Sequence, residues 1–331
     1  MIRFGICSQE DLTSLSSKGF LGRRKSVAMT LYPEIVATND PDRDVKLQHI
    51  LRRFAIDNGA FKWTESRRFE EFDAAVVGLV RERFDRPRPF SVHDVGASDG
   101  RTSVDFFRSL AGIEGLTPEF VASDLAPELK VLQEGSVKLV LDPETGSLLQ
   151  VIRPPFVFNM RKRESVLLYP GNRLAWAFLA RRRVRRMLAS SNIRLLGKSI
   201  WLLAPVCLQL IAEDPRFTFR RHDVFERDRA RRDLVRAMNI LNRSYFRDDE
   251  LLRVIDNVYR SLRTGGLLVT GSNQSAGSQV DGTVYERSEA GFRSIWTSGR
   301  GSQVDDLIGA YVVGPDTPPP EKSDVLGDDF T

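Results

Sequence analysis

A glycine-rich loop between a short apolar run and a helical pattern is the first feature of this chain that could do chemistry. The run Phe90 to Val95 leads into Gly96-Ala97-Ser98-Asp99-Gly100, and a helical pattern follows from Arg101 to Leu110. A strand, a loop and a helix in this order place backbone N–H groups and a helix N-terminus beside a ligand. Gly96 permits a tight turn, and Gly100 permits the helix start to lie close to that ligand. Taken alone, the loop also fits an ordinary turn, whereas a nicotinamide-binding loop would read G-x-G-x-x-G.

Acidic and amide side chains accompany the ends of the next predicted strands. Asp124 follows the strand Phe120 to Ser123, and an acid there can accept hydrogen bonds from both ribose hydroxyls of an adenosine. Asp223 lies in the strand Phe217 to Phe225. The strand Leu234 to Leu241 contains Asn239 and runs into Asn242. Because ligands bind at the carboxyl ends of strands in open α/β sheets, we expect these side chains at one ligand site.

The glycine loop resembles the first motif of the class I S-adenosylmethionine-dependent methyltransferases. The match is Asp94-Val-Gly96-Ala-Ser98-Asp-Gly100, with Ser98 where many members have a glycine. The resemblance implies that Asp124 binds the ribose of S-adenosyl-L-methionine and that Asp223 contacts its adenine amino group. The implied cofactor-binding residues are Asp94, Gly96, Ala97, Ser98, Gly100, Asp124, Leu125, Asp223, Val224 and Asn239. The block from Asp233 to Asn273 also resembles the same stretch of the chemotaxis-receptor glutamate methyltransferases.

Catalysis of methyl transfer needs little from the protein beyond alignment, because the sulfonium methyl is already activated. An oxygen or nitrogen acceptor also needs its proton removed, whereas a carboxylate acceptor needs no base. Candidates for positioning the acceptor are Asn239, Asn242 and Tyr245, although strand-end capping by the asparagines and packing by the tyrosine are open alternatives. We expect only a minor role as a base for His222, and His93 is expected to be structural.

The remaining elements predict a doubly wound α/β fold. Further strands are expected at Leu267 to Thr270, Thr283 to Arg287 and Phe292 to Ser298, the last two as an antiparallel pair. The prediction is a Rossmann-like methyltransferase sheet, seven-stranded and mostly parallel, with the first core strand beside the fourth. The expected domains are a helical N-terminal region (1–88), a methyltransferase domain (89–314) with an insert at about 130–212, and a disordered acidic tail (315–331).

The insert carries a local excess of positive charge. From Val151 to Ile200 there are twelve lysines and arginines against a single acid, Glu164. A hairpin is predicted over Val137 to Ile152, and a helix from Asn172 to about Ser190. The basic part, 153–198, is expected to meet an anionic membrane surface or lipid, apolar side down. The open alternative is an apolar stripe packed on the core with solvated arginines. No Asn-Pro-Pro-aromatic motif supports a nucleic-acid acceptor.

Composition narrows the classes of protein to which this chain can belong. The chain has 331 residues, a net charge of +5, two cysteines and three histidines. Such usage argues against a disulfide scaffold and against a structural zinc site, so no metal is expected. The prediction is a cytoplasmic S-adenosylmethionine-dependent methyltransferase, with peripheral membrane contact left open. Its acceptor is left open among a small molecule, a lipid-linked intermediate and a protein carboxylate. The alternatives are a non-catalytic binding module with the same fold and a nucleic-acid methyltransferase.

Overall fold

The structure is a computed structural model that carries side chains. It describes residues 5–13, 26–54, 62, 64–84, 88–160, 178, 181–189, 197–273 and 279–314. The tail at 315–331, and residues 172–177, 179–180 and 190 of the predicted helix that starts at Asn172, lie outside the described residues.

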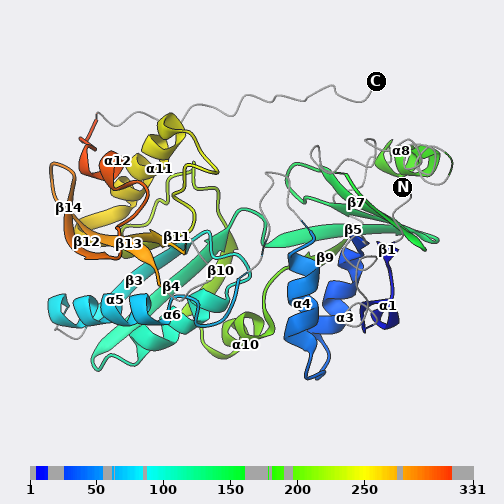
Figure 1. Cartoon of the computed structure of the whole chain (residues 1–331), viewed down its shortest axis with the longest axis horizontal. Helices are drawn as coiled ribbons and strands as arrows, with labels where there is room; N and C mark the ends of the chain where they lie inside the picture. Colours follow the sequence, from blue (N-terminus) through cyan, green and yellow to red (C-terminus); the bar gives the residue numbers. More distant parts are fainter. Residues whose placement is uncertain are drawn as a thin grey trace. The chain divides into compact units, whose positions relative to one another are not determined.

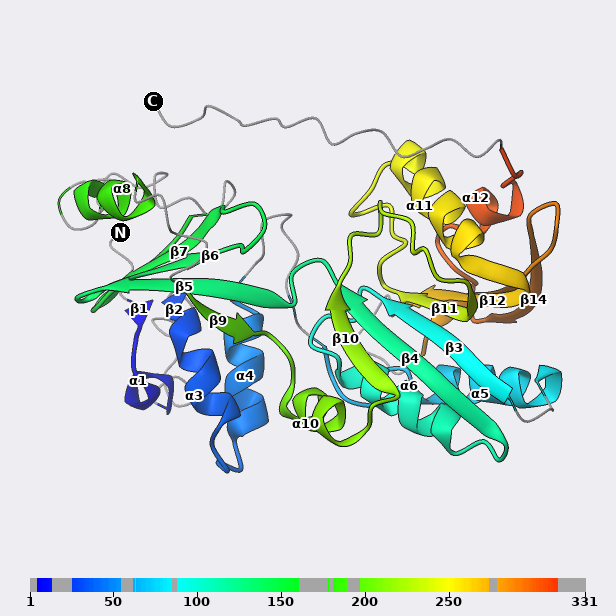
Figure 2. The same ribbon diagram turned by 180° about the vertical axis from the view of Figure 1, so that it is seen from behind.

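The larger sheet has seven strands in the order β10-β4-β3-β11-β12-β13-β14. Its members are β3 (Arg88–Val95), β4 (Leu116–Asp124), β10 (Phe217–Arg221), β11 (Arg232–Met238), β12 (Leu262–Ser272), β13 (Asp281–Arg287) and β14 (Phe292–Ser298). The pairs β10–β4, β3–β11 and β11–β12 are parallel, whereas β12–β13 and β13–β14 are antiparallel. Figure 2 shows β10, β4 and β3 side by side. The prediction of a doubly wound, mostly parallel, seven-stranded sheet with the first core strand beside the fourth is therefore confirmed.

Amphipathic helices cover this sheet. The helices are α5 (Glu70–Arg83), α6 (Arg101–Ala111), α10 (Pro205–Glu213), α11 (Asp248–Ser261) and α12 (Asp305–Gly309). On α11, Leu251, Ile255 and Val258 are buried in one cluster with Val235 of β11. On α5, the ring of Phe72 packs so closely on β13 that a Cβ at Gly282 would lie 2.7 Å from it. These contacts follow the helical spacing of apolar residues in the sequence.

A second sheet occupies the region of the predicted insert. It is antiparallel with the order β8-β7-β6-β5-β9. The strands are β5 (Glu128–Glu134), β6 (Val137–Leu141), β7 (Leu148–Arg153), β8 (Phe156–Asn159) and β9 (Lys198–Trp201). The hairpin expected over Val137 to Ile152 is present as β6–β7. The prediction of a hairpin plus a helix was incomplete, because three further strands flank that hairpin.

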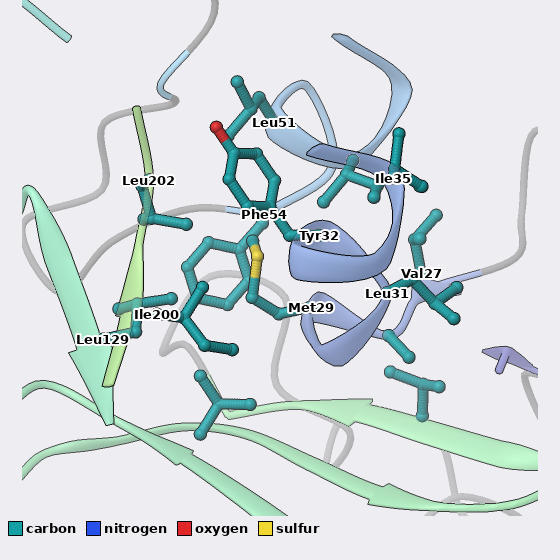
Figure 3. Packing of buried hydrophobic residues seen from close by; sticks show 14 of the residues in the cluster. Val27, Met29, Leu31, Tyr32, Ile35, Leu51, Phe54, Leu129, Ile200 and Leu202 are labelled. Carbon is teal, nitrogen blue, oxygen red and sulfur yellow. The ribbon is translucent and has the colours of Figure 1, made fainter. Parts of the chain in front are cut away.

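Short N-terminal elements pack on one face of the second sheet. They are β1 (Gly5–Ile6), α1 (Gln9–Thr13), β2 (Ser26–Val27), η1 (Met29–Leu31), α3 (Tyr32–Val36) and α4 (Arg43–Leu51). In Figure 3, Met29 and Phe54 lie against Leu129 and Ile200 of the sheet. The buried amide of Gln150 accepts a 2.8 Å hydrogen bond from Met29 N–H and donates one to the Val27 carbonyl. The N-terminal elements and the insert therefore share one core.

The chain divides into two compact units. The first contains Met1–Glu70, Ala97–Gly112 and Phe120–Arg221, and the second contains Glu71–Gly96, Ile113–Glu119 and His222–Thr331. This division does not follow the boundary predicted at residue 88, because the N-terminal elements up to α4 fall with the insert while nearly all of α5 falls in the other unit. Sequence order was the only guide to the predicted boundary.

The arginine-rich helix α8 (Arg182–Ala189) lies on the other face of the second sheet (Figure 1). Val184 and Met187 are buried against that face, in one cluster with Leu139 and Phe158. The apolar stripe of α8 therefore packs on the protein, which was the alternative to a stripe laid on a membrane. No helix in the described part of the chain has the length and the apolar composition that a membrane span requires.

Candidate active site

The glycine loop is held in an unusual conformation. Gly96, Ser98 and Gly100 have φ values of +74°, +57° and +83°. A left-handed conformation is uncommon for a residue other than glycine, and such strain gathers at functional sites. Ala97 N–H donates to the Ser123 carbonyl, and Ser98 N–H donates to Asp124 Oδ2, each at 2.8 Å. The end of β4 thus fixes the shape of the loop that follows β3.

Asp124 is surrounded by donors. Besides Ser98 N–H on Oδ2, its Oδ1 accepts from Ala126 N–H at 3.2 Å and from Lys62 Nζ at 2.6 Å. The Lys62 side chain is only 3% exposed, and its ammonium also lies 3.4 Å from the Ser98 carbonyl. Leu125, beside this acid, is half-buried.

Lys62 is the residue at this site that the sequence did not reveal. It stands in the N-terminal region, 62 residues before Asp124, in no recognisable motif. Buried lysines are rare unless paired, but burial itself is not visible in a sequence. Only the fold brings this cation to the acid.

The structure gives a steric reason for glycine at position 100, whereas the sequence predicted that Gly100 permits close approach to a ligand. A Cβ at this position would lie 2.4 Å from Cys207 Sγ on α10. The close neighbour of Gly100 is therefore a helix of the protein itself. Burial, together with the nearby Asp99 carboxylate, raises the pKa of the Cys207 thiol well above its usual range, so this cysteine stays a neutral packing group.

Behind the loop, Asp99 and Arg101 anchor it to α4. Arg101 Nε donates to Asp99 Oδ2 at 2.9 Å, and its terminal nitrogens donate to Asp44 at 3.0 and 3.3 Å. The Asp99 carbonyl also accepts from Ala204 N–H at 2.8 Å. Burial tends to lower the pKa of Arg101, but the hydrogen bonds to Asp44 and Asp99 raise it above its usual range. A permanently charged guanidinium therefore holds the start of α6.

Asp94, the first acid of the motif, is buried in a separate network. Its Oδ2 accepts from Arg236 Nη1 at 2.9 Å, and Arg236 Nη2 donates to Asp73 at 3.0 Å. Asp94 is 1% exposed, and Arg236 is among the most deeply buried side chains of the described residues. A cofactor-binding role for Asp94 stays a prediction, while its observed bond is to Arg236.

Asp223 follows β10 and is half-buried. Its Oδ1 accepts from Phe225 N–H at 3.0 Å, which closes a tight turn, and Val224 packs on the α11 cluster. The second carboxylate oxygen has no hydrogen bond among those seen between described residues, consistent with an acid that has capacity for a ligand.

The three candidates for positioning an acceptor differ in their surroundings. Asn239 has a left-handed φ of +59°, and its Oδ1 accepts from Asn273 N–H at 3.2 Å. Asn242 Oδ1 accepts from Ser244 N–H at 2.8 Å, which is the capping alternative. Tyr245 is 58% exposed, so the idea that it packs in the core is wrong. Of the three, Asn239 combines a strained backbone with a position directly after β11.

Two histidines lie together on the α11 side of the sheet. The rings of His93 and His222 are 5.0 Å apart, and His93 Nδ1 lies 3.1 Å from Asp228 Oδ2. Asp228 also accepts from Arg232 at 2.8 Å. A small cavity here is lined by His93, His222, Glu226 and Asp228, among others. The buried pairing of His93 agrees with the structural role expected for it.

Three features decide whether an adenosine ligand fits the loop. Asp124 stands at the carboxyl end of the strand next to β3, where a ribose-binding acid belongs. Ser98 Oγ is buried and has no hydrogen-bond partner among the described residues, which leaves a polar group for a ligand to satisfy. Lys62, however, covers Asp124. The residues fit the ligand once the Lys62 ammonium leaves the carboxylate.

Comparison with known proteins gives fold-level likenesses only. No protein-family model matches the chain, and no curated protein matches it. Among solved structures, S-adenosylmethionine-bound CalS10, an amino pentose methyltransferase from Micromonospora echinaspora, is 15% identical, with 69% of this chain and 61% of that chain covered and a TM-score of 0.30. An S-adenosylmethionine-dependent methyltransferase from Clostridium acetobutylicum is 9% identical, with 69% and 60% covered and a TM-score of 0.32.

The sugar N-methyltransferase KedS8 from Streptoalloteichus is 16% identical, with 65% and 51% covered and a TM-score of 0.28. The chain thus spans less than two thirds of each of these proteins. Values this low do not establish a shared activity. The doubly wound α/β fold stands on the strand order of the sheet itself, and the local resemblance to chemotaxis-receptor enzymes stays a prediction.

Proposed function

We propose that this chain binds S-adenosyl-L-methionine and transfers its methyl group to an acceptor. The observation that carries the proposal is the hydrogen bond between Ser98 N–H and Asp124. It joins a left-handed glycine loop to an acid at the end of β4, the strand next to β3 in the sheet. That pairing supplies a turn for the methionine part and an acceptor for the ribose hydroxyls.

The proposed roles of the residues follow from their chemistry. Asp124 accepts the ribose hydroxyls, Asp223 accepts from the adenine amino group, and the loop backbone lies along the methionine part. The bound cofactor supplies an already activated methyl group. Asn239 and the exposed Tyr245 orient the acceptor. A carboxylate acceptor then needs alignment alone, whereas an oxygen or nitrogen acceptor that carries a proton must also lose it.

A second candidate function is a non-catalytic binding module with the same fold. One observation favours it, namely that Lys62 neutralises the acid on which cofactor binding depends. Cofactor binding by the wild-type protein separates the two candidates.

We expect the wild-type protein to bind S-adenosylhomocysteine, and Asp124→Asn to weaken that binding by about 1–3 kcal/mol. The reason is that the ribose hydroxyls lose a charged acceptor. The measurement is titration calorimetry. Asp248→Asn, at an exposed acid on α11, is the matched control and should leave the affinity unchanged.

Two results would count against this proposal. If the folded wild-type protein binds neither S-adenosylhomocysteine nor S-adenosylmethionine, the non-catalytic module is favoured. If both bind but Asp124→Asn leaves the affinity unaltered, Asp124 is removed from the site.

We also propose that α8 contacts an anionic membrane surface. Arg181, Arg182, Arg185 and Arg186 lie exposed on its outer face, and Phe178, just before it, is 83% exposed. In the described part of the chain, Arg183 pairs with Glu134, whereas no ion pair is seen for these four arginines. Since Val184 and Met187 are buried, the contact is electrostatic and runs through the arginines and Phe178.

Exchanging Arg182, Arg185 and Arg186 together for glutamine is expected to weaken binding to phosphatidylserine vesicles by about 3 kcal/mol, roughly 1 kcal/mol per arginine. Co-sedimentation at low salt measures this, and binding should fall as salt screens the charges. The control replaces Arg247, Arg293 and Arg300, which are equally exposed elsewhere. If the wild-type protein does not bind anionic vesicles at low salt, the membrane proposal is wrong. If it binds RNA instead, the anionic partner of α8 is a nucleic acid.

A further inference from the structure

Lys62 competes for the lone pairs that a ribose would need. A carboxylate oxygen has two lone-pair directions, so Asp124 offers about four acceptor positions in all. On Oδ1, Lys62 Nζ at 2.6 Å and Ala126 N–H at 3.2 Å take both. On Oδ2, Ser98 N–H takes one. A single position is left, whereas a ribose presents two hydroxyls.

The contact is also strong enough to persist without a ligand. The side chains of Lys62 and Asp124 are 3% and 12% exposed, so water screens their attraction poorly. The Ser98 carbonyl, 3.4 Å from the ammonium, holds the lysine above the loop itself. Lysine reaches this place on a four-carbon stem with freely rotating bonds, which allows it to withdraw without a change in the strands.

We infer that Lys62 is an internal ligand of the cofactor site, which occupies the ribose position of Asp124 until the cofactor displaces it. This inference rests on the proposed function. Its consequence is a closed and an open state of the same site. The apparent affinity for the cofactor is then lower than the intrinsic affinity by the fraction of molecules in the open state.

The principal test compares S-adenosylhomocysteine binding by the wild-type protein, Lys62→Met and Lys198→Met in titration calorimetry. Lys198 lies exposed on β9 and serves as the matched control. If about nine in ten wild-type molecules are closed, Lys62→Met tightens binding roughly tenfold, and more if the closed fraction is larger. Lys198→Met should match the wild-type protein. Unchanged or weaker binding by folded Lys62→Met overturns the inference.

A second measurement reads the contact directly in the wild-type protein, so a variant that fails to fold does not leave the inference undecided. Acetylation by acetic anhydride, followed by mass spectrometry, should modify Lys62 much more slowly than Lys198. Adding S-adenosylhomocysteine should speed the modification of Lys62 and leave Lys198 unaffected. Equal rates without ligand, or a Lys62 that stays protected in the complex, overturn the inference.

The outcomes for the two proposals are separate. If S-adenosylhomocysteine binds while Lys62 stays protected, the inference about Lys62 is wrong but the proposed cofactor site stands. If neither the wild-type protein nor Lys62→Met binds S-adenosylhomocysteine, and Lys62 of the wild-type protein stays protected with and without the ligand, the proposed cofactor site is wrong. In that case the Lys62–Asp124 pair is a structural ion pair.

Discussion

Replacing Arg236 by methionine is expected to lower the free energy of unfolding by about 3–5 kcal/mol, because two buried carboxylates would lose the guanidinium that donates to both. Arg236 donates to Asp73 at 3.0 and 3.2 Å and to Asp94 at 2.9 Å. Burial acts to lower the pKa of this arginine, but the charges of Asp73 and Asp94 raise it, so it remains a cation at all ordinary pH. Chemical denaturation followed by circular dichroism measures the loss.

Two further variants separate charge from packing. Arg293→Met removes an exposed arginine that pairs with Glu286, and the expected loss is at most about 1 kcal/mol. Adding Asp73→Asn and Asp94→Asn to Arg236→Met should restore most of the stability, because no unpaired charge then stays buried. If Arg236→Met alone costs less than 1 kcal/mol, the pairing is not a structural necessity.

The sheet was predictable from the sequence because its signals are local. The apolar runs around Val92, Ala122 and Val235 lie between turn residues, and parallel strands buried on both faces read as such runs. Gly96 marks the turn after β3 through its backbone freedom, and Asp124 marks the end of β4 through its charge. The position of the first core strand beside the fourth was also predicted, and the structure agrees with it.

The second sheet and Lys62 were not predictable in the same way. Strand β9 depends on a partner that lies far away in the chain, because it pairs with β5 from Glu128↔Trp201 to Val131↔Lys198. Lys62 reaches Asp124 only through tertiary folding, and no spacing rule links a lysine to an acid 62 residues later. Non-local pairing of this kind is invisible to periodicity.

Gly100 has a steric requirement for glycine that the motif does not reveal. Its φ of +83° is what a glycine permits, and that much follows from the motif. The missing Cβ, however, makes room for Cys207 on α10, about a hundred residues later. Sequence reasoning can find that a position must be small, but it cannot name the neighbour that requires it.

Replacing Asp228 by alanine is expected to cost about 3–5 kcal/mol of unfolding free energy at pH 7, because a buried arginine and His93 lose their acceptor. Asp228 Oδ2 lies 3.1 Å from His93 Nδ1 and 2.8 Å from Arg232 Nη2. Burial acts to raise the pKa of Asp228, but the hydrogen bonds from His93 and Arg232 outweigh it and hold the pKa well below its usual range.

The sign of that pKa shift fixes how the loss depends on pH. A carboxyl with a depressed folded-state pKa contributes its full stability above the unfolded-state value of about 3.9, and the contribution falls as the pH drops further toward the folded-state pKa. The difference between wild type and Asp228→Ala should therefore be constant from about pH 5 to 7 and shrink below about pH 4.

The nearby His222 and Glu226 also face this group, so both proteins are compared at each pH. Denaturant unfolding at pH 7, 5 and 3.5 gives the difference, with Asp306→Ala at an exposed acid as the control. A difference that stays constant down to pH 3.5, or one below 1 kcal/mol at pH 7, would show that Asp228 does not hold Arg232 and His93 through its charge.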